Sequence, residues 1–213
     1  MNAHASGLLP PLATDTCMVL AAGLGKRMRP LTVSQPKPMV RVAGKPLLDH
    51  ALDRLTAAGI ARAVVNVHYL GDAIEAHVKG RTEPQVVISD ERDQLLETGG
   101  GLARAGGLLP DPFFCMNSDN IWLDGPYDAF HELSRAWDPD RMDALLLVTG
   151  HARTHNFHGT GDFHMDGLGR LSRRRAARVA PFVFTGVQLV SKRLLRDAPS
   201  GAFSTNLLWD RAI

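Results

Sequence analysis

The sequence predicts an α/β fold: a Rossmann-like, doubly wound, mostly parallel mixed sheet with helices on both faces. Short apolar runs alternate with segments whose apolar residues recur at helical spacing, which is typical of βαβ units. Gly-rich hairpin signals follow in residues 161–172. The chain has 213 residues, of which 45% are hydrophobic, enough for one sizeable core. In such a sheet, ligands bind at the carboxyl ends of the strands.

The individual elements follow from these patterns. Strands are expected over residues 17–21, 63–67, 85–89, 112–116 and 144–149, and the last of these is expected to be fully buried. Helices are expected over residues 45–58, 71–78, 99–109 and 127–136. Residues 203–213 resemble a helix that lacks a Gly or Asn cap at its end.

Composition and charge indicate how many domains to expect and which classes of partner are disfavoured. We expect residues 1–14 to form a disordered leader and residues 15–213 a single domain whose C-terminal end is truncated. Lys and Arg total 24 against 22 acidic residues, and a net charge of +2 does not favour nucleic acid or a membrane surface as a partner. Cys17 and Cys115 stand in apolar runs and are interpreted as buried free thiols. With neither a signal peptide nor a long apolar span, the sequence predicts a cytoplasmic protein.

A glycine-rich turn after the first expected strand carries most of the functional information. Gly23 and Gly25 lack Cβ atoms, so their backbone N–H groups can approach phosphate oxygens closely. Arg27 can form a bidentate fork to the same oxygens, and Lys37 can act as a mobile point charge. The turn therefore predicts a polyphosphate site.

Two better-known glycine loops do not fit this turn. A Walker loop needs Ser or Thr after Gly-Lys, whereas Arg27 follows Lys26. The dinucleotide fingerprint needs a third glycine where Met28 stands. The phosphate site is therefore of another kind.

The same residues carry a resemblance to a family. Leu20-Ala21-Ala22-Gly23-x-Gly25-x-Arg27-Met28, followed by Lys37-Pro38-Met39, resembles the signature of sugar-1-phosphate nucleotidyltransferases. Similar segments recur at residues 65–70, 96–101, 117–122 and 184–187, so the resemblance spans about residues 17–208. Within the family, the chain looks most like the bacterial subgroup that uridylylates N-acetylmuramate 1-phosphate in cell-wall recycling.

The resemblance implies a Mg2+-dependent enzyme that transfers a nucleotidyl group, with UTP favoured as donor, to a sugar 1-phosphate and releases pyrophosphate. It implies catalytic roles for Arg27 and Lys37 on the reacting phosphates. Nucleotide binding is implied for Leu20, Ala21, Ala22, Gly23, Gly25, Lys26, Glu91, Thr98, Gly99 and Gly100, with residues 98–101 resembling the loop that reads the base. Sugar-phosphate binding is implied for Asn66, His68, Glu97, Asp162, Thr185 and Gly186. Glu91 remains open to interpretation as a surface carboxylate.

The chemistry of this reaction suits the residue types. The second pKa of a phosphate monoester is about 6, so the attacking oxygen is anionic near neutral pH and needs no general base. Positioning and charge stabilisation are the main requirements. Asp119 follows the apolar run at residues 113–116 and is the candidate Mg2+ ligand, with a turn cap as the alternative. The family's second aspartate motif is absent here, which leaves Asp162 or Asp210 as a substitute.

Several alternatives stay open at this stage. The arginines at positions 173, 174, 175 and 178 are expected on a solvated, mobile loop, although one of them can meet a carboxylate, because muramate carries a lactyl acid. Mannose-1-phosphate guanylyl transfer and glucose-1-phosphate uridylyl or thymidylyl transfer are alternative reactions. A catalytically weak nucleotide-sugar-binding regulatory protein is an alternative of another class. The sequence does not specify an oligomeric state.

Overall fold

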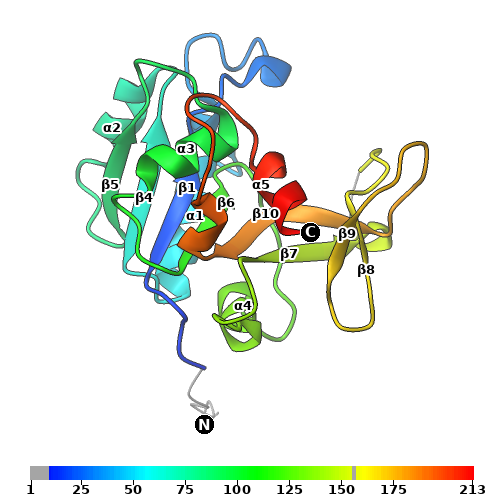
Figure 1. Ribbon diagram of the computed structural model, residues 1–213. Helices are drawn as coiled ribbons and strands as arrows, with labels where there is room; N and C mark the ends of the chain where they lie inside the picture. The colour runs from blue at the N-terminus through cyan, green and yellow to red at the C-terminus, as the bar shows by residue number, and fades with distance from the viewer. Residues whose placement is uncertain (1–9, 155–156) are drawn as a thin grey trace, which may run out of the picture.

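The computed structural model describes residues 10–154 and 157–213, which build one large mixed sheet (Figure 1). Its parallel half runs in the order β5 (Gln85–Asp90), β4 (Arg62–Val67), β1 (Thr16–Leu20) and β6 (Phe113–Asn117). Its antiparallel half begins at β10 (Phe182–Val190), which pairs with β6, β7 (Ala144–Gly150) and β8 (Phe163–Met165). β8 pairs with β9 (Leu171–Arg173), and a separate small hairpin joins β2 (Arg41–Val42) and β3 (Lys45–Pro46).

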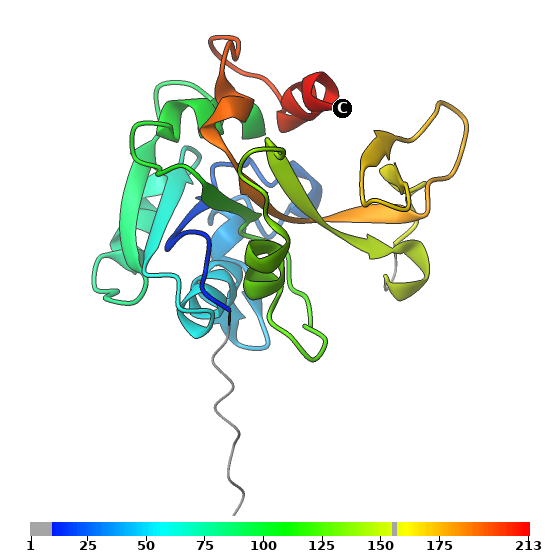
Figure 2. The ribbon, with the colours of Figure 1, turned by 60° about the horizontal axis from the view of Figure 1, so that its bottom comes forward.

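Helices cover both faces of the sheet because successive strand residues point to opposite sides. On one face, Cys17 and Val19 of β1 join the core beneath α1 (Leu47–Ala57), α2 (Gly71–Val78) and α4 (Ala129–Ala136). On the other face, Met18 joins the core beneath α3 (Glu97–Ala105) and α5 (Thr205–Ala212). Figure 2 shows the two layers from a second direction. Short 3-10 turns η1 (Lys26–Met28), η2 (Lys37–Met39), η3 (His151–Arg153) and η4 (Lys192–Leu195) complete the elements.

The predicted fold class is confirmed, with differences that have local causes. The strand expected to be fully buried, β7, is half-buried, because it lies at the edge of the sheet and pairs only with β10. The first helix starts at Leu47 rather than residue 45, because Lys45–Pro46 pairs with β2. The third helix starts at Glu97, before the glycines that were expected to begin it.

The N-terminal segment differs from expectation where it is described. Residues 10–14 pack against α4 instead of forming part of a disordered leader, whereas residues 1–9 lie outside the described residues. The Ala13 N–H donates to Ser134 Oγ at 3.0 Å, and His131 Nδ1 lies 2.7 Å from the Pro10 carbonyl oxygen. Cys17 and Cys115 are buried free thiols, as predicted. Across the described ranges, no helix is long and apolar enough to cross a membrane.

Candidate active site

The carboxyl ends of β1, β4 and β6 open onto a cavity of about 270 Å3, here called the glycine-loop cavity. Ten of its lining residues were predicted as site residues: Leu20, Ala21, Ala22, Gly23, Arg27, Lys37, Asn66, Glu97, Thr98 and Asp119. Pro38, Leu95, Asn117 and Ser118 complete the lining. The fold therefore brings the phosphate turn, the start of α3 and the end of β6 to one place, as parallel-strand topology requires.

The glycine turn is closed by its own contacts. Gly25 has φ of +61°, and a Cβ atom there would lie 2.9 Å from Thr32 Cγ2. The Thr32 hydroxyl donates to the Gly25 carbonyl at 2.8 Å. Gly25 and Lys26 do not line the cavity, so Gly25 acts on the shape of the turn that carries Arg27.

The two cations of this cavity differ in whether they have an acidic partner. Lys37 Nζ forms an ion pair with Asp119, and both side chains are about a quarter exposed (26%). Asp119 thus faces the cavity and pairs with Lys37, which argues against the alternative of a turn cap. Within the described ranges, the Arg27 side chain has no hydrogen bond or ion pair with a protein group. An anion bound in the cavity could therefore pair with Arg27 without displacing a protein partner.

A buried polar chain lies directly behind the cavity wall. The Ala21 N–H donates to Asn66 Oδ1 at 2.7 Å, and Asn66 Nδ2 donates to Glu91 Oε1 at 2.8 Å. Glu91 is fully buried (0% exposed), and its Oε2 has no hydrogen-bond partner among the described residues. This burial raises the pKa of Glu91. The interpretation of Glu91 as a surface carboxylate is wrong. Glu91 lines neither described cavity. It acts on the end of β1 through its hydrogen bond with Asn66.

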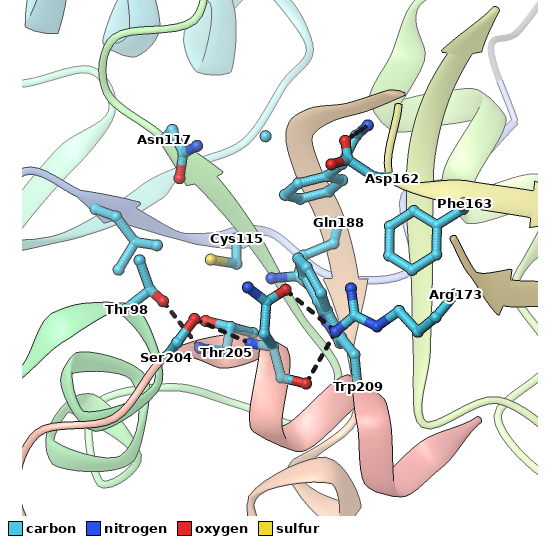
Figure 3. A pocket seen from close by; sticks show the side chains of 14 residues that line it. Thr98, Cys115, Asn117, Asp162, Phe163, Arg173, Gln188, Ser204, Thr205 and Trp209 are labelled. Carbon is cyan, nitrogen blue, oxygen red and sulfur yellow. Dashed lines mark hydrogen bonds between the residues drawn. The ribbon is translucent and has the colours of Figure 1, made fainter. Parts of the chain in front are cut away.

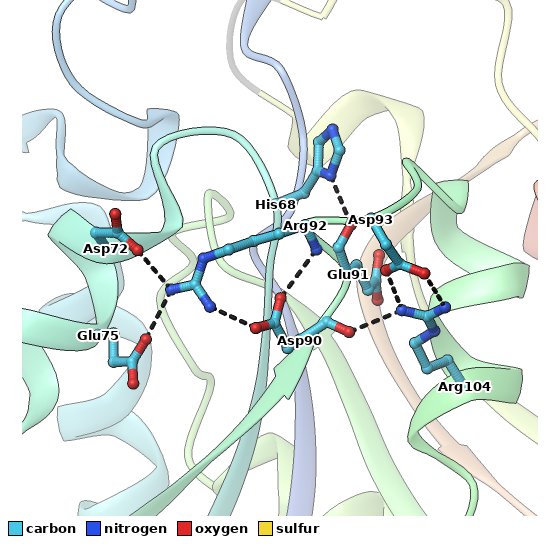
Figure 4. A network of polar contacts seen from close by, with 8 residues as sticks. All are labelled: His68, Asp72, Glu75, Asp90, Glu91, Arg92, Asp93 and Arg104. Carbon is cyan, nitrogen blue, oxygen red and sulfur yellow. Dashed lines mark hydrogen bonds and ion pairs between the residues drawn. The ribbon is translucent and has the colours of Figure 1, made fainter.

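Ion pairs at the surface hold the segment that carries Glu91 (Figure 4). They join Arg92 to Asp72, Glu75 and Asp90, and Arg104 to Asp93. His68 Nδ1 lies 2.6 Å from the Glu91 carbonyl oxygen. His68, predicted to bind the sugar phosphate, lines neither described cavity and instead contacts this backbone segment.

The glycines after Thr98 lie within α3, as the helix expected over residues 99–109 requires, although residues 98–101 resemble a base-reading loop. The N–H groups of Gly99 and Gly100 both donate to the Phe203 carbonyl, at 2.8 and 3.1 Å. A Cβ on Gly99 would lie 2.4 Å from the Phe203 ring, and one on Gly100 would lie 2.4 Å from the Gly201 carbonyl oxygen. These glycines permit the segment before α5 to pack on α3. Their binding of a nucleotide stays a prediction, and their N–H groups are already engaged.

A second cavity of about 270 Å3, here called the C-terminal cavity, lies between the antiparallel strands and α5 (Figure 3). Of the predicted sugar-phosphate residues, only Asp162 and Gly186 line it. Leu20, Thr98 and Asn117 line both cavities, so the two adjoin. The remaining lining residues are Cys115, Phe163, Arg173, Phe184, Gln188, Ser204, Thr205, Asn206 and Trp209.

Polar contacts between distant segments shape the C-terminal cavity. Asp162 Oδ2 accepts from the Phe184 N–H at 2.9 Å, which fixes this carboxylate at the start of β8. The Thr205 N–H donates to Thr98 Oγ1 at 2.9 Å and ties α5 to α3. Thr185, by contrast, lines neither described cavity and donates its hydroxyl to the Leu147 carbonyl at 2.8 Å.

Sequence reasoning did not single out Arg173 among its neighbouring arginines, and it missed the contribution of α5. Arg173 belongs to β9 and its side chain points into the C-terminal cavity, so its expected place on a solvated loop is wrong (Figure 3). The Gly-rich hairpin signal before it was a usable indication of a strand pair. No local pattern indicated that α5 would supply Thr205, Asn206 and Trp209 to the same cavity.

The sequence profile of the MobA-like NTP transferase domain matches residues 17–188, which is most of the chain. The chain belongs to this family. Within it the protein is a sugar-1-phosphate nucleotidyltransferase, so the resemblance seen in the sequence is confirmed. The transferase is 47% identical over 204 residues to an N-acetylmuramate alpha-1-phosphate uridylyltransferase of Caulobacter vibrioides, covering 93% of this chain and 84% of that protein.

More distant relatives differ in the sugar and the base that their names record. A mannose-1-phosphate guanylyltransferase catalytic subunit beta of Danio rerio is 31% identical over 158 residues, which is 66% of this chain but only 43% of that protein. The inositol-1-phosphate CTP transferase of T. maritima superposes with a TM-score of 0.74 at 18% identity, covering 94% of this chain and 81% of that one. This structural similarity establishes the shared fold.

The donors of the glycine-loop cavity suit a magnesium ion that is held mainly by its substrate. Asp119 and Glu97 are the carboxylates in the lining, and no group of three His, Cys, Asp or Glu side chains that could hold a metal occurs in the described part of the transferase. Mg2+ is commonly bound through one or two carboxylates plus phosphates and water, so this set fits. Asp162 lines the other cavity and Asp210 pairs with Arg173, so neither joins Asp119 there.

Proposed function

We propose that the transferase moves a UMP group from UTP to N-acetylmuramate 1-phosphate and releases pyrophosphate. The observation that carries this proposal is the 47% identity to the Caulobacter vibrioides enzyme over nearly the whole chain. A second N-acetylmuramate alpha-1-phosphate uridylyltransferase, from Neisseria meningitidis serogroup B, is also 47% identical, over 151 residues that make up 70% of this chain and 63% of that protein. In this proposal the reaction takes place in the cytoplasm and forms a UDP-sugar as a step in the recycling of cell-wall sugar.

The two adjoining cavities divide the substrates between them. The triphosphate enters the glycine-loop cavity, where Arg27 is unpaired and Lys37 is held close by Asp119. The sugar enters the C-terminal cavity, whose amide, hydroxyl and carboxylate groups suit sugar hydroxyls. The acceptor phosphate then meets the α-phosphorus near Leu20, Thr98 and Asn117, which line both cavities.

The cations perform the chemistry that this arrangement requires. The acceptor phosphate is already anionic, so no residue has to remove a proton from it. Arg27 and Lys37 offset the repulsion between the phosphates and stabilise the charge that builds on pyrophosphate. Cys115 lines the C-terminal cavity, but burial raises its pKa to about 12, so the thiol stays protonated and is not a nucleophile.

Magnesium use is a further part of the proposal. Asp119 would hold the ion once Lys37 turns from this carboxylate to a phosphate. Mg2+ bound with the triphosphate supplies charge neutralisation across the reacting phosphates. Because Asp119 pairs with Lys37 in this structure, we expect nucleotide and metal to be taken up together.

A substrate panel tests the proposed function. The full chain is mixed with Mg2+, one nucleoside triphosphate and one sugar 1-phosphate, and pyrophosphate release is measured. UTP with N-acetylmuramate 1-phosphate is expected to give the highest kcat/KM. Faster turnover of GTP with mannose 1-phosphate, or of UTP or dTTP with glucose 1-phosphate, would favour those reactions. Nucleotide-sugar binding by calorimetry without any pyrophosphate release would favour a regulatory protein.

A further inference from the structure

The C-terminal cavity contains a cation that the transfer reaction itself does not need. Among the described residues that line it, Arg173 is the only Lys, Arg or His. The phosphates are served by Arg27 and Lys37 in the other cavity. N-acetylmuramate 1-phosphate carries a second anion, the carboxylate of its lactyl ether, and N-acetylglucosamine 1-phosphate is the same sugar phosphate without that group. An arginine in the sugar cavity matches this chemical difference.

The guanidinium of Arg173 is fixed in place by its neighbours. Nε donates to Asp210 Oδ1 at 2.5 Å, and Nη2 lies 3.0 and 3.1 Å from the carbonyl and side-chain oxygens of Asn206. Cζ stands 4.9 Å from the Phe163 ring centroid and 5.5 Å from that of Trp209. A guanidinium held this way loses little further conformational entropy when it binds a ligand.

Donors remain available on the same surface. Within the described ranges, Arg173 Nη1 has no acceptor, although arginine offers five N–H donors. Thr205 Oγ1 is buried and has no partner among the described residues, and Thr205 also lines this cavity. An Nη1 group without an acceptor and an unpaired hydroxyl in one cavity are suited to a carboxylate ligand.

Arg173 differs from the two arginines that follow it in the chain, because neither of those lines the cavity. Arg174 Nε donates to the Gly161 carbonyl and Nη1 to the Arg178 carbonyl, so this arginine is engaged by backbone. Arg175 is exposed and does not line the cavity. Asp162 is an acceptor suited to sugar hydroxyls. Both Asp162 and Asp210, which pairs with Arg173, oppose a carboxylate, so the Nη1 group, free within the described ranges, is the donor that such a ligand would use.

We propose that Arg173 binds the lactyl carboxylate of N-acetylmuramate 1-phosphate and thereby selects this sugar over N-acetylglucosamine 1-phosphate. The inference rests on the proposed function and adds to it the residue that distinguishes the two sugars. Arg173 acts here as a specificity determinant, with no part in the transfer of the nucleotidyl group.

The test compares both sugar phosphates in the wild-type chain and in Arg173→Met, with UTP and Mg2+. For N-acetylmuramate 1-phosphate, kcat/KM is expected to fall about 100-fold, chiefly through KM, because a charge-assisted hydrogen bond to the substrate is lost. For N-acetylglucosamine 1-phosphate, kcat/KM is expected to change less than about threefold. Arg173→Lys keeps the charge but not the fork, and an intermediate loss of about tenfold is expected. Arg175→Met is the matched control and should leave both values unchanged.

The possible results distinguish a failure of the role of Arg173 from a failure of the proposed function. If the wild-type chain prefers N-acetylmuramate 1-phosphate and Arg173→Met keeps that preference, the inference is overturned and the proposed function stands. If Arg173→Met lowers kcat/KM equally for both sugar phosphates, Arg173 only holds α5 in place. That result also overturns the inference. If the wild-type chain does not turn over N-acetylmuramate 1-phosphate, the proposed function fails and the inference fails with it.

Discussion

The glycine-loop cavity and the C-terminal cavity have the same volume, about 270 Å3, but they are built in different ways. The first lies where parallel strands end, and short contiguous segments such as residues 20–23 provide much of its lining. The second lies over antiparallel strands and α5, and residues from segments far apart in the chain, including 162–163 and 204–206, line it. In the proposed function, the first kind of cavity takes the triphosphate and the second takes the sugar.

Charge follows the same division. Arg27 faces the glycine-loop cavity unpaired within the described ranges, while Lys37 pairs with Asp119. Arg173 in the C-terminal cavity is held by Asp210 and Asn206. A cation without a protein partner is available to phosphates whose charge changes during transfer, and a cation held by its neighbours suits recognition of a static group.

The largest expected effect comes from removing the cations of the glycine-loop cavity. Arg27→Ala and Lys37→Ala should each lower kcat by on the order of 100-fold or more, because each removes charge stabilisation from the transition state. Pyrophosphate release measures the rate, and thermal unfolding checks that the fold survives. Arg29→Ala, in an exposed residue of the same turn, is the matched control and should leave the rate nearly unchanged. Near wild-type turnover in both cavity variants would reject the phosphate role.

A smaller loss is expected from the carboxylate. Asp119→Asn keeps the shape of the side chain but loses its charge, so its rate should fall about tenfold at low Mg2+ and recover in part as Mg2+ is raised. Initial rates across a Mg2+ titration measure both effects. Activity and Mg2+ dependence equal to those of the wild type would show that Asp119 is not a metal ligand.

These two predictions concern the region that the sequence described best. The βαβ pattern and the spacing of Gly23, Arg27 and Lys37 were sufficient to place the glycine-loop cavity at the strand ends, because parallel topology brings those ends together. The surroundings of Glu91 could not be predicted, since its burial depends on Asn66 and on the packing of α3. The place of Arg173 depends on contacts with Asn206 and Asp210, more than 30 residues away in the chain, which no local pattern encodes.

A substitution in α3 distinguishes a packing role of its glycines from a role in binding the base. Gly100→Ala should lower the free energy of unfolding by about 2 kcal/mol, because the new Cβ would lie 2.4 Å from the Gly201 carbonyl oxygen. Denaturant unfolding measures this change. Gly107→Ala, where no atom lies within 4 Å of the added Cβ, is the control and should be neutral. Unchanged stability of Gly100→Ala with weaker UTP binding would restore the base-binding interpretation of these glycines.

The smallest expected effect is a pH dependence of stability at Glu91. Burial raises the pKa of Glu91 above its unfolded value, so the folded state keeps the proton in a pH window where the unfolded chain has released it. The wild-type chain therefore loses free energy of unfolding as pH rises through that window, whereas Glu91→Gln does not titrate. The free energy of unfolding of both proteins is measured from about pH 5 to about pH 8. Relative to the wild-type chain, the variant should become more stable as pH rises. The exposed Glu83→Gln serves as control. A difference that stays constant across the range would contradict this account.

The division of substrates between the two cavities is tested most directly by a crystal structure of the ternary complex with a non-hydrolysable UTP analogue and N-acetylmuramate 1-phosphate. We expect the triphosphate beside Arg27 and Lys37 and the sugar ring in the C-terminal cavity, with its lactyl carboxylate on Arg173. A sugar bound in the glycine-loop cavity, or a nucleotide bound in the C-terminal cavity, would contradict the account.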